Sequence, residues 1–146
     1  MMLVVPDASV ILKWVLQKGE EADSPAALRL LEHFLADRIE IRLPSLWRYE
    51  VGNILGMKTP HMASEAMETL LAYEFDEEAL HREYCLAVLR LMREVRRISF
   101  YDASYHVLAL RAKGTYVTAD LDYMKKARRK GHIALLSDWS PPTRSH

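Results

Sequence analysis

Four acidic residues stand in four different predicted elements, and together they could bring four carboxylates into one cleft. They are Asp7, Glu50, Asp102 and Asp120. Asp7 directly follows the apolar run Leu3–Val5, and Asp120 follows the β-branched and aromatic run Thr115–Thr118, with one residue between. Each therefore lies at the carboxyl end of a predicted strand, the edge where open parallel sheets place their ligands. If these strands are neighbours where the strand order reverses, the two aspartates lie side by side.

The other two acids are expected on helices. Leu46 and Ile54 lie four residues before and after Glu50, which puts its carboxylate in an apolar helical stripe. Burying an unpaired carboxylate is costly, so Glu50 must be ion-paired, protonated or bound to a metal. Asp102 lies three residues after Ser99, in the first turn of its helix, where the helix dipole favours a negative charge.

A carboxylate cluster offers only oxygen ligands, and such sets bind hard cations such as Mg²⁺ or Mn²⁺. Bound metal can activate a water molecule and stabilise the leaving oxygen during phosphodiester cleavage. The sequence offers no better nucleophile. Its single cysteine, Cys85, lies in a predicted amphipathic helix, and it has neither a glycine-rich phosphate loop nor a Gly-x-Ser-x-Gly motif. The six histidines show no spacing typical of zinc ligands.

Each acid also has an ordinary structural explanation, which the sequence leaves open. The three aspartates could cap turns or helices. Glu50 could form a buried ion pair with Arg42 or Arg48. In that case the chain would be a non-catalytic α/β domain that binds a nucleotide or a protein.

Predicted strands and helices alternate along the chain. The strands are Leu3–Val5, Ile39–Leu43, Thr115–Thr118 and Ile133–Leu136. The helices are Val10–Leu16 with Ser9 as N-cap, one from Ser24-Pro25, Leu46 to about Gly56, one from Thr59-Pro60, Asp76–Arg97, one capped by Ser99 that ends at Gly114, and Leu121–Lys130. This alternation predicts an α/β fold with a mostly parallel sheet of four to five strands and helices on both faces. Gly19 to Asp23 is predicted as a turn, residues 1–140 as one domain and residues 141–146 as a tail.

The overall charge gives no reason to expect nucleic-acid binding, because 20 Lys and Arg balance 20 Asp and Glu. Any such site must depend on local charge. The helix after Asp120 carries Lys125, Lys126, Arg128 and Arg129, which we expect to contact RNA phosphates. The alternative is a solvated helix face, the usual meaning of a charged run.

The sequence predicts a cytoplasmic protein without a membrane segment. One cysteine excludes a disulfide within the chain. The opening apolar run is too short for a signal peptide, and no run of about 18 apolar residues occurs.

The segments around the four acids resemble PIN domains. They are Val5–Ser9 (VPDAS), Pro44–Leu55 (PSLWRYEVGNIL), Tyr101–Tyr105 (YDASY) and Val117–Asp120 (VTAD). The resemblance extends from Leu3 to about Leu136, and the VapC-type toxins of prokaryotic toxin–antitoxin pairs are the most similar subgroup. It implies that the four acids bind one or two Mg²⁺ or Mn²⁺ ions and that the chain is an endoribonuclease.

The same resemblance implies further residues and partners. Ser9 and Thr118 match hydroxyl positions that support the site, and Asp122 matches an acid that some members add. A homodimer and a small antitoxin that blocks activity are also implied. The leading hypothesis is therefore a toxin endoribonuclease. A PIN nuclease that processes RNA without a toxin role would use the same residues.

Overall fold

Strands and helices alternate along the computed structural model, which describes residues 1–16 and 23–141. Its main elements are β1 (Met2–Pro6), α1 (Ala8–Val15), α2 (Ser24–Leu35), β2 (Ile39–Pro44), α3 (Trp47–Lys58), α4 (Ala63–Ala72), β3 (Asp76–Glu78), α5 (Arg82–Glu94), α6 (Phe100–Ala112), β4 (Thr115–Thr118), α7 (Leu121–Ala127) and β5 (Ile133–Leu135). Short 3₁₀ turns follow α7 (Arg128–Lys130) and β5 (Leu136–Asp138).

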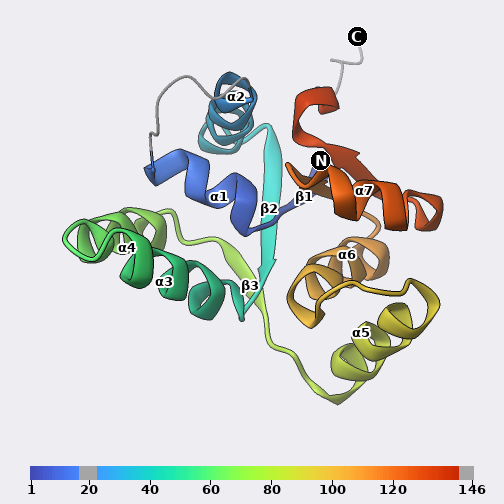
Figure 1. The fold of residues 1–146 in the computed structure, drawn as a ribbon. Coiled ribbons are helices and arrows are strands. Elements are labelled where there is room, and N and C mark those ends of the chain that lie inside the picture. Colours follow the sequence, from blue (N-terminus) through green and yellow to red (C-terminus); the bar gives the residue numbers. More distant parts are fainter. Residues whose placement is uncertain (17–22, 142–146) are drawn as a thin grey trace, which may run out of the picture.

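The five strands form one parallel sheet in the order β3-β2-β1-β4-β5. Helices α1 to α4 lie on one side of the sheet and α5 to α7 on the other (Figure 1). The predicted α/β fold with helices on both faces is thus confirmed. The strand order reverses between β1 and β4, where Pro6 lies opposite Val117 and the Asp7 amide donates to the Val117 carbonyl at 3.2 Å. This is the position at which such sheets bind ligands.

β1 and β4 lie in the core, which explains why their sequences consist mostly of apolar and aromatic residues. Val4, Val5, Tyr116 and Val117 are completely buried. Helix α6 contacts β1, β2 and β4 on one face of the sheet while α5 packs against its other side. All residues of α6 from Ala103 to Ala109 are therefore buried, and this part of the helix has no polar face toward solvent.

A close approach fixes the connection between α6 and β4. A Cβ atom at Gly114 would lie 2.7 Å from both the side chain and the carbonyl oxygen of Leu3. Only glycine fits here without a shift of β1. Just before it, Lys113 adopts the left-handed conformation that ends α6.

Helix starts are the least accurate part of the sequence prediction. α1 begins at Ala8 and its N-cap is Asp7, not Ser9, because the Asp7 carboxylate accepts the first free amides. α4 begins at Ala63 rather than at Thr59-Pro60, since residues 59–62 form a turn before the helix. α2 begins at Ser24, with Asp23 in the N-cap position.

The predicted helix Asp76–Arg97 was wrong at both ends, since α5 also stops at Glu94. Asp76–Glu78 pairs with β2 as the edge strand β3, and α5 begins only at Arg82 with His81 as its cap. At the other end of the chain, α7 stops at Ala127 and the last residues of the predicted helix continue as a 3₁₀ turn.

Residues 17–22 and 142–146 lie outside the described part of the structure, so most of the predicted turn and tail are not described. Among the described residues, no helix is long and apolar enough to cross a membrane.

Candidate active site

Asp7 lies directly after β1 and is almost completely buried, at 3% exposure. Its Oδ1 accepts hydrogen bonds from the Ser9 amide (3.0 Å), the Ser9 hydroxyl (2.5 Å) and the Val10 amide (3.4 Å). The Tyr116 hydroxyl donates to Oδ2 at 2.7 Å. Asp7 thus caps α1, as its structural explanation required. All of these donors are uncharged, so they leave its negative charge unbalanced.

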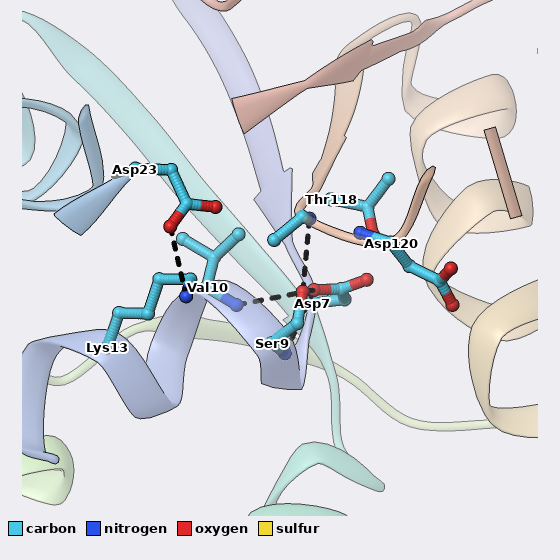
Figure 2. A network of polar contacts seen from close by, with 8 residues as sticks. Asp7, Ser9, Val10, Lys13, Asp23, Thr118 and Asp120 are labelled. Carbon is cyan, nitrogen blue, oxygen red and sulfur yellow. Dashed lines mark hydrogen bonds and ion pairs between the residues drawn. The ribbon is translucent and has the colours of Figure 1, made fainter. Parts of the chain in front are cut away.

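The end of β4 comes together with the end of β1. Figure 2 shows Asp7, Ser9, Thr118 and Asp120 gathered at this point. The Asp120 amide donates to Thr118 Oγ1 (3.0 Å), and the Ala119 amide donates to Ser9 Oγ (3.1 Å). Asp120 also caps α7 through its Oδ1. Because Ser9 contacts both Asp7 and the loop after β4, it connects the two strand ends.

Glu50 reaches the same region from the first turn of α3. The Tyr105 hydroxyl of α6 donates to Glu50 Oε1 at 2.8 Å. Arg48 instead pairs with Glu77, with 2.7 Å between Nε and Oε1. Within residues 1–16 and 23–141, no ion pair joins Glu50 to Arg48 or Arg42, so the alternative of a structural ion pair is not observed.

Asp102 lies in the first turn of α6, but its carboxylate is not the cap of that helix. Ser99 is the N-cap, because its Oγ accepts a hydrogen bond from the Asp102 amide at 3.0 Å. Burial first, and then the charges of Asp7 and Asp120, raise the pKa of the Asp102 carboxyl to about 6, against a lowering by the hydrogen bond with Ser99 and by the charge of Lys126. Asp102 is therefore half-buried beside two other acids.

The four carboxylates interact electrostatically. Burial first, and then the charges of Asp102 and Asp7, raise the pKa of Glu50 to about 7, against a lowering by the hydrogen bond from Tyr105. Burial also raises the pKa of Asp7, whose hydroxyl and amide donors oppose the increase. Through these pairwise effects each of the four acids is coupled to at least one other.

The donor set suits a hard divalent cation. It consists only of carboxylate oxygens in excess negative charge, held by uncharged donors. In the described part of the chain, no three Asp, Glu, His or Cys side chains already converge as metal ligands. A bound cation would have to draw the carboxylates closer together, and it would relieve their mutual repulsion.

The three supporting residues expected from the PIN resemblance differ in position. Ser9 and Thr118 are within the site: both hydroxyls form hydrogen bonds with Asp7. Asp122 lies on the exposed face of α7, where it pairs with Lys126 at 2.8 Å. We therefore place Asp122 outside the four-acid cluster.

The basic residues of α7 and of the 3₁₀ turn after it differ in their contacts. Lys126 Nζ donates to the carbonyl of Arg97 (3.0 Å), and Arg129 Nη2 donates to the carbonyl of Glu94 (2.9 Å). These contacts hold α7 and the following turn against the C-terminal end of α5 and the segment that follows it. The other two residues of the predicted set, Lys125 and Arg128, are exposed, as Arg129 also is.

Two residues that contact the acids were missed from the sequence, namely Tyr105 and Tyr116. A signal existed for each. Tyr105 follows Asp102 by three residues, which places both on one side of α6. Tyr116 precedes Thr118 by two residues, which places both on one face of β4. His106, which also lies near Asp102 in sequence, is buried against Tyr123 and Gly131 instead.

Comparison with known proteins gives one family and several similar structures. The family model described as PIN domain matches residues 4–130. No curated protein matches the sequence. The VapBC2 structure from Rickettsia felis, bound to a promoter DNA fragment, has a TM-score of 0.69 at 15% identity and covers 92% of this chain and 97% of that chain.

Two further solved structures have the same fold. A toxin–antitoxin complex from Klebsiella pneumoniae has a TM-score of 0.67 at 15% identity over 91% of this chain and 97% of that chain. VapC20 from Mycobacterium tuberculosis, a sarcin–ricin loop cleaving toxin, has a TM-score of 0.64 at 14% identity over 88% and 95%. At such identities the similarity is one of fold.

The raised pKa values predict how pH affects the metal-free protein. The folded state binds protons on Glu50 and Asp102 more tightly than the unfolded chain does, so stability is present at low pH and is lost as pH rises through about 6 to 7. Urea unfolding in EDTA from about pH 4.5 to 7.5 should therefore show a falling free energy of unfolding. Glu50→Gln should flatten this dependence, whereas Glu32→Gln, on the exposed face of α2, should not. An unchanged dependence in Glu50→Gln would contradict the electrostatic account.

Proposed function

Because this chain belongs to the PIN-domain family, we propose that it is a metal-dependent endoribonuclease that hydrolyses RNA phosphodiester bonds at Asp7, Glu50, Asp102 and Asp120. The observation that carries the proposal is the coupling of these four carboxylates at the switch point of the sheet. Bound Mg²⁺ or Mn²⁺ would supply an activated water and stabilise the charge that develops on the phosphodiester.

The four acids would contribute to cation binding in different ways, according to their positions. Asp7 and Glu50 are held by hydroxyl donors, which orient their oxygens for one or two cations. Asp102 is half-buried and Asp120 is exposed, so these two complete the ligand set on the open side, where RNA would enter. Since ligands bind metal in their ionised form, cation binding would release the protons that burial favours on Glu50 and Asp102.

We infer that RNA phosphates bind a basic surface beside the acids, formed by residues 90–97 and 125–130. These two segments hold nine of the 20 Lys and Arg residues of a chain without net charge. Their contact through Lys126 and Arg97 joins them, and Lys126 lies near enough to Asp102 to lower its pKa. A phosphate backbone on this surface would therefore lead to the cleft. That VapC20, of similar fold, cleaves the sarcin–ricin loop supports RNA as the substrate class.

We also propose that the chain forms a homodimer, that a small antitoxin binds it, and that the protein acts in the cytoplasm. One of the similar structures is a toxin–antitoxin complex, and another is VapBC2 bound to promoter DNA. A groove of about 420 Å³ between α3 and α4 would accept apolar side chains of a partner. It is lined by Gly52, Leu55, Ala63, Ser64, Met67 and Glu68.

The cleavage reaction gives the direct test of the proposed function. The protein should cleave single-stranded or looped RNA with Mg²⁺ or Mn²⁺ and lose this activity in EDTA, because the activated water depends on the metal. Asp102→Asn should abolish cleavage, while Asp138→Asn, at an exposed position after β5, should leave it unchanged. Undiminished cleavage in excess EDTA would exclude the mechanism.

The basic surface can be tested by the salt dependence of RNA binding. Replacing both Lys125 and Arg128 by Ala should reduce the slope of log K against log salt by about 1.4, or about 0.7 for each lost phosphate contact. Lys58→Ala, at an exposed position on α3, removes a charge elsewhere and should leave the slope unchanged. A slope equal to that of the parent in the double variant would show that RNA does not contact this surface.

Sedimentation separates the toxin from the alternative of an RNA-processing nuclease. The purified chain is expected to sediment as a dimer, and as a larger complex when co-expressed with a small protein encoded beside it. A strict monomer without such a partner would favour RNA processing without a toxin role.

A further inference from the structure

Tyr105 and Tyr116 form a buried pair beneath the acids. Both side chains are completely buried, on α6 and β4 respectively. Their rings stack with centroids 6.3 Å apart and planes at 18°. The Tyr105 hydroxyl donates to Glu50 Oε1 at 2.8 Å, and the Tyr116 hydroxyl donates to Asp7 Oδ2 at 2.7 Å. A single aromatic pair therefore contacts acids from two different parts of the chain.

The surrounding rings keep Tyr116 in place. The ring centroids of His106 and Tyr123 lie 5.5 Å and 5.4 Å from that of Tyr116. His106 is itself fixed, because its Nδ1 lies 2.8 Å from the Tyr123 hydroxyl and its Nε2 lies 2.8 Å from the Gly131 carbonyl. The Tyr116 hydroxyl cannot turn away from Asp7 without disturbing this packing.

A phenol has a specific advantage over a lysine or arginine at such a site. It stabilises and orients a carboxylate through one lone pair, yet adds no positive charge to offset the acids or to compete with a cation. The remaining oxygen lone pairs of Asp7 and Glu50 stay available. Without these donors the like-charged carboxylates would be free to move apart.

We propose that Tyr105 and Tyr116 are positioning residues that orient Glu50 and Asp7 for a divalent cation, an inference that rests on the proposed function of the acid cluster. Hydrogen-bond partners of metal ligands commonly contribute about 10- to 100-fold to metal affinity. Loss of either hydroxyl should therefore weaken Mn²⁺ binding about 10-fold or more.

Tyr84 provides a matched control. It is also completely buried, and its hydroxyl donates to the Ser104 carbonyl at 2.6 Å. Tyr84→Phe thus removes the same buried hydroxyl from the same kind of environment, but away from the acids. Its effect on stability should resemble that of the other two substitutions, whereas its effect on metal binding should not.

The experiment measures the Mn²⁺ dissociation constant by calorimetry at about pH 8, which is above the pKa of Glu50 (about 7) and of Asp102 (about 6), together with urea unfolding without metal. Tyr105→Phe and Tyr116→Phe should bind Mn²⁺ about 10-fold more weakly than the parent, and Tyr84→Phe should bind it as the parent does. Parent-like affinity in both variants, or an equal loss in Tyr84→Phe, would overturn the inference while leaving the proposed function intact. If Tyr116→Phe does not fold, Tyr105→Phe against Tyr84→Phe decides. A parent that binds no Mn²⁺ would instead refute the proposed function itself.

Discussion

The repulsion among four carboxylates in one partly buried cleft is the constraint on which the rest of the site depends. Burial raises the pKa of Asp7, Glu50 and Asp102, and the charges of neighbouring acids contribute to the increase at Glu50 and Asp102. Such a cluster reduces the stability of the folded protein at neutral pH unless something compensates for it. The hydrogen bonds described to these carboxylates come from uncharged donors, namely the hydroxyls of Ser9, Thr118, Tyr105 and Tyr116 and backbone amides, while the charge of Lys126 offsets part of the repulsion at Asp102. The negative charge thus stays available for a cation.

The fold supplies this arrangement through contacts that are distant in sequence. The parallel pairing of β1 with β4 brings two strand ends together at the switch point. The central helix α6 brings Asp102 and Tyr105 to the same edge. The first turn of α3, which carries Glu50, is held by Glu77 of β3, whose Oε1 accepts from Trp47 Nε1 (2.5 Å) and Arg48 Nε (2.7 Å). The edge strand β3 therefore contributes to the site without touching it.

The sequence predicted those parts that local patterns determine. Apolar runs followed by an aspartate identified β1 and β4, and Ser99 identified the start of α6. β3 could not be predicted, because Asp76–Glu78 has three acidic side chains and is a strand only through its backbone pairing with β2. The tyrosine donors were missed for a related reason. Spacing places Tyr105 on the side of Asp102 and Tyr116 on the face of Thr118, but that their hydroxyls reach Glu50 and Asp7 depends on how α6 lies beside α3 and how β4 pairs with β1.

Anomalous diffraction from crystals soaked in Mn²⁺ tests the central claim most directly, because it locates the metal independently of activity. The account predicts anomalous density between the carboxylates of Asp7, Glu50, Asp102 and Asp120, with the hydrogen bonds from Tyr105 and Tyr116 retained. A lysine or arginine side chain paired with these acids, and Mn²⁺ absent from them at saturating concentration, would contradict it and identify the acids as structural caps and ion pairs.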